Sequence, residues 1–304
     1  MSRKLIAAVI CITFGLLTTG CADSTFSAQL ISDADSIAVT SSDAPSAKRI
    51  IALANGSAEI IAGMGLQSFL VGRDIASTAT QLADVPIATS GHQVIPERIF
   101  ELQPDLLLID NTTGPAKAIA TVQGAGIRVV LIDEAWAVAD IAKKVTAIAQ
   151  AIGADSAGLR LNQAIAAKIG AIQQVRADTK IAFLYLRGGS AIYLLGGQGA
   201  GADDLIARVG AIDVGAARYD QPFTPISSEA LISTDPDIIL VMQKGLASVG
   251  GVAGLIELPG IAQTTAGKNG AVIAVDDSLL LSFGPRTPDL LERFSKVISE
   301  LSKR

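Results

Sequence analysis

Short aliphatic runs and helix-spaced apolar positions alternate along the first half of the chain. The runs at 49–54, 69–72, 105–109 and 128–132 predict buried strands, since each is unbroken and bounded by turn-forming or polar residues. The stretches between them predict helices at 58–64, 96–102, 115–123 and 138–152. Strands that alternate with helices indicate a parallel sheet covered on both faces.

The same alternation returns in the second half, after a long helical pattern. Residues 155–175 keep helical spacing with Gly170 as the one strong breaker, and a new aliphatic run begins at Lys180. We therefore expect an α/β protein of two lobes with parallel-rich sheets, joined by a long connecting helix, with a ligand cleft between the lobes. The predicted boundaries are 49–153 for the first lobe, 154–178 for the connecting helix and 179–304 for the second lobe.

A repeated segment supports two similar lobes. Residues 97–109 and 229–241 share an opening glutamate, a short helical stretch, a Pro-Asp pair seven residues on and an aliphatic run. The offset of about 130 residues is far longer than the period of a solenoid. The same order of elements is common in α/β proteins, so chance remains an alternative for this segment taken alone.

The N-terminus has the pattern of an export signal. Arg3 and Lys4 precede an apolar run that is too short to span a bilayer, and Gly20-Cys21 follows it. Residues 1–20 are predicted to be a signal peptide and Cys21 the lipidated residue of a lipobox, although Thr18 stands where leucine is usual. Residues 21–48 are rich in Ser, Ala, Asp and Thr and predict a flexible tether.

Composition narrows the function classes. Cys11 and Cys21 are the two cysteines of the sequence, so the mature domain has no disulfide and no catalytic thiolate. The net charge of −5 gives no reason to expect nucleic acid as a partner. The 304 residues leave room for two α/β lobes after the signal and the tether.

A few residues could carry chemistry. His92 is the single histidine, which argues against a zinc or manganese cluster and excludes a histidine-based triad unless His92 is the base. Tyr185 and Arg187 end a predicted strand and face the same side, where α/β sheets bind ligands. A nearby cation favours the phenolate, which is a ligand for ferric iron. Taken alone, each of these residues is more often a surface or packing residue than a ligand.

Other candidates are weaker on their own. Met242 ends the second repeated strand and could be a core residue, a weak axial ligand or an apolar wall. Arg286 precedes the last predicted helix and could bind a carboxylate near the cleft. The glycines of 196–201 lack the Gly-Lys-Ser/Thr of a phosphate loop, and the sequence contains no Gly-x-Ser-x-Gly nucleophile elbow.

These segments together resemble the substrate-binding lipoproteins of bacterial ABC importers, in the class with a helix between two α/β lobes. The resemblance covers residues 49–303. Within this class the chain is most similar to HmuT-type haem-binding proteins. The resemblance is carried by the segments 90–93, 183–188, 193–203, 241–246 and 282–288.

The resemblance implies a set of roles. His92 and Tyr185 would bind haem iron from opposite faces, Arg187 would hydrogen-bond the phenolate, and Met242 would lie beside the tyrosine. Arg286 would lie at the rim near the haem propionates. Glu97 and Glu229, one on each lobe, would dock onto the permease.

The expected protein is therefore not an enzyme. It is a monomeric receptor, anchored by lipid to the outer face of the cytoplasmic membrane, which passes haem to an ABC importer. Three alternatives stay open: the same fold with a ferric siderophore or a corrinoid as cargo, a secreted hydrolase, and an extracellular adhesion module.

Overall fold

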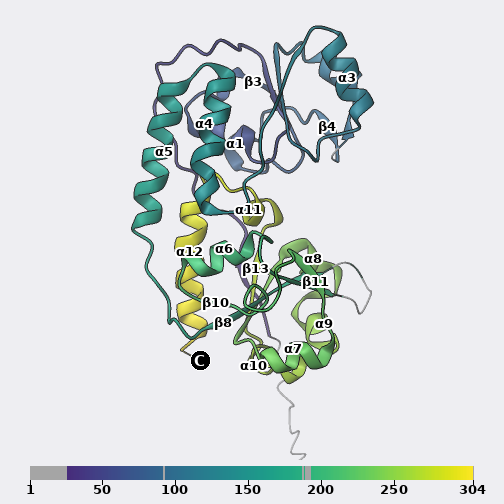
Figure 1. Ribbon diagram of the computed structural model, residues 1–304, viewed down its shortest axis with the longest axis vertical. Coiled ribbons are helices and arrows are strands. Elements are labelled where there is room, and N and C mark those ends of the chain that lie inside the picture. The colour runs from purple at the N-terminus through teal and green to yellow at the C-terminus, as the bar shows by residue number, and fades with distance from the viewer. Residues whose placement is uncertain (1–25, 92, 187, 189–192, 304) are drawn as a thin grey trace, which may run out of the picture.

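Two separate sheets form the centres of two lobes in the structure, a computed structural model in which residues 26–91, 93–186, 188 and 193–303 are described (Figure 1). The first sheet is fully parallel with the order β3-β2-β6-β7. Its strands are β2 (Ile50–Ala52), β3 (Leu70–Arg73), β6 (Leu106–Ile109) and β7 (Arg128–Leu131).

The second sheet is mixed and has the order β1-β13-β12-β8-β9-β11, with β10 paired to β8. β9 runs antiparallel to β8 and to β11, and the other pairs are parallel. The strands are β1 (Gln29–Ile31), β8 (Lys180–Leu186), β9 (Tyr193–Gly196), β10 (Ile212–Asp213), β11 (Phe223–Pro225), β12 (Ile238–Met242) and β13 (Val272–Val275). The predicted α/β class with parallel-rich sheets is confirmed.

Helices cover both sheets. Those of the first lobe are α1 (Ser57–Gly63), η1 (Gln67–Phe69), η2 (Thr80–Leu82), α2 (Pro96–Glu101), α3 (Ala116–Gly124), η3 (Val138–Asp140) and α4 (Ile141–Ile152). Those of the second lobe are α6 (Ala202–Arg208), α7 (Ser228–Thr234), α8 (Gln243–Ser248), α9 (Gly251–Glu257), η4 (Ile261–Gln263), α10 (Thr265–Asn269), α11 (Asp277–Leu281) and α12 (Thr287–Leu301). A small hairpin of β4 (Thr89–Ser90) and β5 (Gln93–Val94) stands apart from the first sheet.

The lobes are joined by α5 (Asp155–Gly170), which packs on α4 and on α12. It descends along one side of the molecule from the first lobe toward the second (Figure 1). The helix is shorter than the predicted 154–178, because it ends at the glycine that the sequence marks as its breaker. Residues 171–179 complete the connection without helix.

One apolar core passes through both lobes. The cluster contains Ile50 and Ile148 of the first lobe, Leu161 of α5, and Ile181 and Leu290 of the second lobe, all at most 2 % exposed. Because interiors are close-packed, lobes that share a core do not move as independent bodies. A hinge opening would separate these packed side chains.

The repeated segments fold in the same way. Ile99 of α2 and Leu231 of α7 are both fully buried and fix the rotation of their helices. Each helix is followed by a residue with positive φ, Gln103 at 47° and Asp235 at 41°. The Pro-Asp carboxylates then accept backbone N–H groups at the start of the neighbouring strand: Asp105 from Lys48 and Arg49, and Asp237 from Lys180. The internal repeat is therefore present in the structure as well as in the sequence.

The predicted flexible tether at 21–48 is wrong for residues 29–47. β1 joins the second sheet beside β13, and Ile31 is 3 % exposed. The chain then crosses to the first lobe, where Val39 N–H donates to the Gly63 carbonyl and Ser46 N–H to the Ile152 carbonyl. The polar composition of this segment concealed its few apolar contacts.

The signal peptide and Cys21 lie outside the described residues, so their assignments stay predictions. Across the part of the chain that is described, no helix has the length and apolar character needed to cross a membrane.

Candidate functional site

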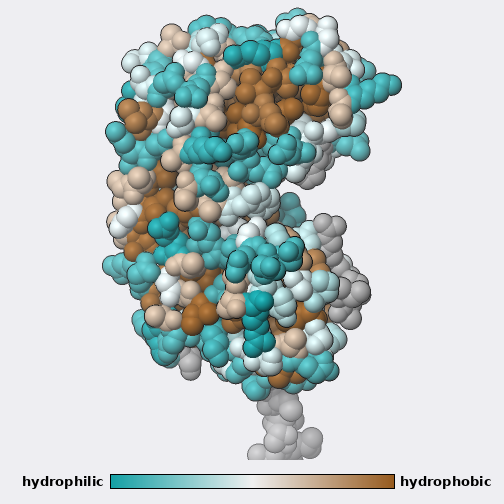
Figure 2. Space-filling model, viewed as in Figure 1, coloured by the Kyte–Doolittle hydropathy of each residue, from teal (hydrophilic) through white to brown (hydrophobic). Residues whose placement is uncertain are grey.

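A cleft of about 390 Å³ lies between the lobes, where the surface is hollowed in the space-filling view (Figure 2). The first lobe contributes Leu53, Asn55, Asp74, Asp110 and Trp136, which stand at the ends of its parallel strands or in the loops that follow them, and Thr89 from the β4–β5 hairpin. The second lobe contributes Tyr185, Met242, Lys244, Asp277, Ser278 and Leu281. Both sheets thus present the carboxyl ends of strands to one cavity, as is usual for ligand sites in α/β folds.

Tyr185 and Met242 lie side by side at the second-lobe wall. Strands β8 and β12 are parallel with Leu184 opposite Val241, so the next residue of each strand reaches the same edge of the sheet. The Tyr185 ring is half-buried and packs against Phe223 with 5.2 Å between ring centroids. The wall therefore combines a phenol with apolar and thioether surface.

His92 and Arg187 lie outside the described residues. Two neighbours of His92, Thr89 and Gly91, line the cleft, and Arg187 directly follows β8, the strand that carries Tyr185. The described residues next to His92 and Arg187 are thus located. The ligand role of His92 and the hydrogen-bonding role of Arg187 stay predictions.

The floor of the cleft carries buried charge. Burial opposes ionisation of Asp110, but N–H donors from Asn55 and Thr112 and the hydroxyls of Thr112 and Thr113 outweigh it and lower the pKa of that carboxyl. Burial lowers the pKa of Lys144 to about 8, while its Nζ donates to the Ser282 carbonyl at 2.9 Å. This lysine belongs to the first lobe and the carbonyl to the second.

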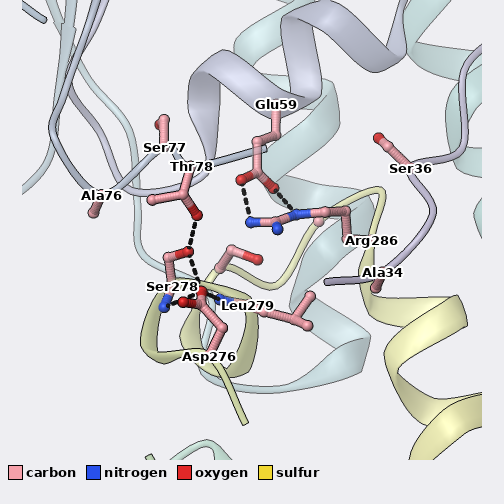
Figure 3. Close-up of polar contacts among 12 residues, drawn as sticks. Ala34, Ser36, Glu59, Ala76, Ser77, Thr78, Asp276, Ser278, Leu279 and Arg286 are labelled. Atoms are coloured by element: carbon pink, nitrogen blue, oxygen red, sulfur yellow. Dashed lines mark hydrogen bonds and ion pairs between the residues drawn. The ribbon is translucent and has the colours of Figure 1, made fainter. Parts of the chain in front are cut away.

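Arg286 is not at the rim of the cleft. It is 2 % exposed, and its Nε donates to Glu59 Oε2 at 3.0 Å, while Nη2 donates to Glu59 Oε1 (Figure 3). Glu59 belongs to α1 and is 1 % exposed, so the guanidinium joins the two lobes in their shared interior. The predicted propionate contact is therefore wrong, because this arginine is buried and forms an ion pair with the Glu59 carboxylate.

Further polar contacts hold the lobes together beside this pair. The Thr78 and Ser278 hydroxyls are 2.5 Å apart (Figure 3), and the Asn55 amide donates to the Leu281 carbonyl at 2.9 Å. Both second-lobe partners lie on α11, a helix that the sequence analysis missed. Its N-cap, Asp276, accepts N–H groups from Ser278 and Leu279 and was the available sequence signal.

The sequence analysis also missed Trp136, Lys144 and Lys244 among the lining residues. Trp136 is the single tryptophan of the sequence and is 41 % exposed, with its indole N–H donating to Glu134 at 3.1 Å. The sequence signal that could have drawn attention to this wall is a single tryptophan that stands shortly after the predicted strand at 128–132.

Glu97 and Glu229 lie away from the cleft lining. Each stands exposed in the first turn of its repeated helix, α2 or α7. Hydrogen bonding from its own backbone N–H and from the Ser227 and Ser228 hydroxyls lowers the pKa of Glu229. The carboxylate of Glu229 is therefore ionised and available to a cationic partner.

A two-lobe α/β fold with a ligand cleft between the carboxyl ends of its sheets is the architecture of a class of ligand-binding proteins. The chain belongs to the periplasmic binding protein family, whose profile matches residues 50–279.

Solved structures and a relative of known sequence show which members of the family this chain resembles. The haem-binding protein HmuT is 32 % identical with a TM-score of 0.79, over 90 % of this chain and 97 % of that chain. The periplasmic haem-binding protein RhuT from Roseiflexus sp. RS-1, in its apo form, is 31 % identical with a TM-score of 0.73, over 84 % and 99 %. An uncharacterised ABC transporter substrate-binding lipoprotein of Bacillus subtilis strain 168, YvrC, is 24 % identical over 88 % of this chain and 84 % of its own length.

Proposed function

We propose that this protein captures haem in the cleft between its lobes and delivers it to the permease of an ABC importer. The observation that carries the proposal is that Tyr185 and Met242 of the second lobe line the same inter-lobe cavity as Thr89 and Gly91, which lie close to His92 in the sequence. The likeness to HmuT and RhuT, which are named for haem binding, supports the choice of cargo.

In this proposal the iron is held between the two lobes. Tyr185 supplies a phenolate from β8 and His92 an imidazole from the first lobe, while Arg187 hydrogen-bonds the phenolate. Met242 offers soft apolar surface beside the porphyrin, and Phe223 packs against the ring of Tyr185. Binding is non-catalytic, and the porphyrin is cargo rather than a resident cofactor.

The surroundings of the protein follow from the same proposal. A lipid on Cys21 anchors it to the outer face of the cytoplasmic membrane, and the soluble part works as a monomer. Glu97 and Glu229 dock onto the permease, one from each lobe. Neither nucleic acid nor a membrane-embedded segment has a part in this function.

A haemin titration of the Tyr185→Phe variant tests the ligand assignment. Loss of an iron ligand should weaken binding on the order of 100-fold, since outer-sphere partners of a metal already contribute 10- to 100-fold. The visible spectrum reports the iron ligands. Quenching of Trp136 fluorescence reports occupancy of the cleft independently, because this tryptophan lines the cavity and has no second tryptophan to mask it.

The matched control is Tyr219→Phe, which removes a phenol that does not line the cleft. Equal haem affinity and equal spectra for both variants would contradict the role of Tyr185. Absent haem binding by the unaltered protein, with Trp136 quenched instead by a ferric siderophore or cobalamin, would replace the cargo while keeping the class.

A further inference from the structure

The charged groups that line the cleft are mostly acidic. Among the described residues they are five carboxylates and two lysines. The carboxylates are Asp74, Asp110, Asp133, Glu134 and Asp277, and the lysines are Lys144 and Lys244. Haem carries two propionates at one edge of its ring, and a carboxylate is held best where a cation meets it in a hydrogen bond. The two lysines therefore decide where that edge can lie.

The first-lobe side of the cleft disfavours a propionate. Burial opposes the ionisation of Asp110, but the hydrogen bonds that it accepts outweigh burial and lower the pKa of this carboxyl. Two negative charges repel each other more strongly where little water screens them. The same side carries apolar lining from Leu53, Ile132 and Ala135, which suits the methyl and vinyl edge of a porphyrin.

Lys144 is already engaged inside the protein. It is 4 % exposed, and its Nζ donates to the Ser282 carbonyl at 2.9 Å. Burial lowers the pKa of this lysine, while the nearby carboxylates of Glu59 and Asp110 act in the opposite direction. Its charge is thus balanced by neighbours, and a shift toward a ligand would break its contact with the second lobe.

Lys244 differs from Lys144 in every one of these respects. It is exposed, and among the described residues its ammonium has neither a hydrogen bond nor an ion pair, while its backbone N–H donates to Asp277 Oδ2 at 3.1 Å. It stands in the first turn of α8, two residues after Met242, so the two Cα atoms are at most about 7 Å apart. The ammonium can therefore reach the edge of a ring whose centre lies at the wall of Tyr185 and Met242.

We propose that Lys244 binds a haem propionate and thereby fixes the propionate edge of the porphyrin beside α8, away from Asp110. The inference rests on the proposed function and deepens it, since it names the group that sets the orientation of the cargo. Complementary charge contributes mainly to orientation and specificity. Lys244 thus takes the role that the sequence analysis gave to Arg286, which is buried against Glu59.

The test compares haemin with haemin dimethyl ester, in which both propionates have lost their charge. Quenching of Trp136 fluorescence measures the affinity of the full-length protein for each porphyrin. Lys244→Gln should weaken the binding of haemin on the order of tenfold and leave that of the ester unchanged, because a hydrogen bond to a charged group contributes this much. The visible spectrum of bound haem should stay the same, since the iron ligands are untouched.

Two further variants make the comparison specific. Lys244→Arg keeps the charge and should retain the preference for haemin over the ester. Lys268→Gln is the matched control, because it removes an exposed lysine of α10 that does not line the cleft. The difference between Lys244→Gln and the unaltered protein should also shrink as salt is added, since the lysine is exposed.

The inference is overturned if Lys244→Gln binds haemin as tightly as Lys268→Gln does. It is equally overturned if Lys244→Gln weakens haemin and the ester by the same factor, because the propionate charge would then have no part in the contact. Binding of neither porphyrin by the unaltered protein would contradict the proposed cargo itself, and the inference with it.

Discussion

Buried ionisable residues set the pH behaviour of single sites in this molecule. Asp213 at the end of β10 is 8 % exposed; its Oδ1 accepts N–H groups from Gly215 and Ala216, while Oδ2 accepts no hydrogen bond from the described residues. Burial raises the pKa of this carboxyl from 3.8 to about 6. The charged form is therefore disfavoured by folding.

The Asp213→Asn variant should be more stable than the unaltered protein at neutral pH. The pKa of Asp213 is higher in the folded than in the unfolded protein. The protonated carboxyl therefore contributes fully to the stability of the fold below pH about 4, and this contribution is lost as the pH rises through about 6. The amide oxygen can keep both N–H contacts, so we expect a gain of about 2 kcal/mol at pH 7 and almost none at pH 4.

Urea denaturation at both pH values measures this difference. Asp178→Asn serves as the control, because Asp178 lies on the surface beside Arg176. A gain of equal size at pH 4 and pH 7 would show that the charge of Asp213 is not the cause.

At the same scale, the sequence predicts residues whose position follows from a strand end and misses those whose partners are remote. Tyr185 and Met242 were each placed at the end of a predicted strand, and the resemblance put them side by side, where the parallel pairing of β8 and β12 also brings them. Arg286 was placed wrongly because a helix start gives no information on burial. Its partner, Glu59, lies 227 residues away.

Among the elements, β1 shows how a short strand escapes prediction. Three residues within a polar stretch give too little periodicity, and the pairing partner β13 is more than 240 residues distant. The longer central strands β6, β8 and β12 were predicted because their aliphatic runs are buried on both faces.

β1 also offers a direct test of its structural role. Ile31 is 3 % exposed and Leu30, on the opposite side of the same strand, is 64 % exposed. Ile31→Ala should reduce the free energy of unfolding by about 2 kcal/mol or more, and Leu30→Ala by no more than about 0.5 kcal/mol.

Urea denaturation of the two variants checks this expectation. Equal and negligible effects would restore the tether interpretation, in which neither side chain has a fixed environment.

The whole molecule is expected to change little in shape when it loads its cargo. The two lobes share an apolar core, and the buried pair of Glu59 and Arg286 joins them. Closing or opening the cleft would expose that ion pair or leave one of its charges buried without its partner. Either change costs free energy, because a buried charge needs its partner in a protein interior.

Small-angle scattering of the haem-free and haem-loaded protein should therefore give radii of gyration within about 1 Å of each other, as for other preorganised complexes. A decrease of several ångströms on loading would show a hinge motion that the shared core does not permit. At this scale the repeat in the sequence predicted two lobes. It could not predict the core that the lobes share, because the contacts of that core join segments far apart in the sequence.

The fixed course of residues 29–47 bears on how the receptor meets its importer. With a lipid on Cys21, only eight residue steps separate the bilayer from the edge of the second sheet, a reach of about 28 Å at full extension. So short a connection would restrict the receptor's diffusion to the plane of the membrane while it searches for the transporter. With that anchor the second lobe would stay nearest the lipid, so a loaded receptor would reach the importer with part of its orientation already chosen.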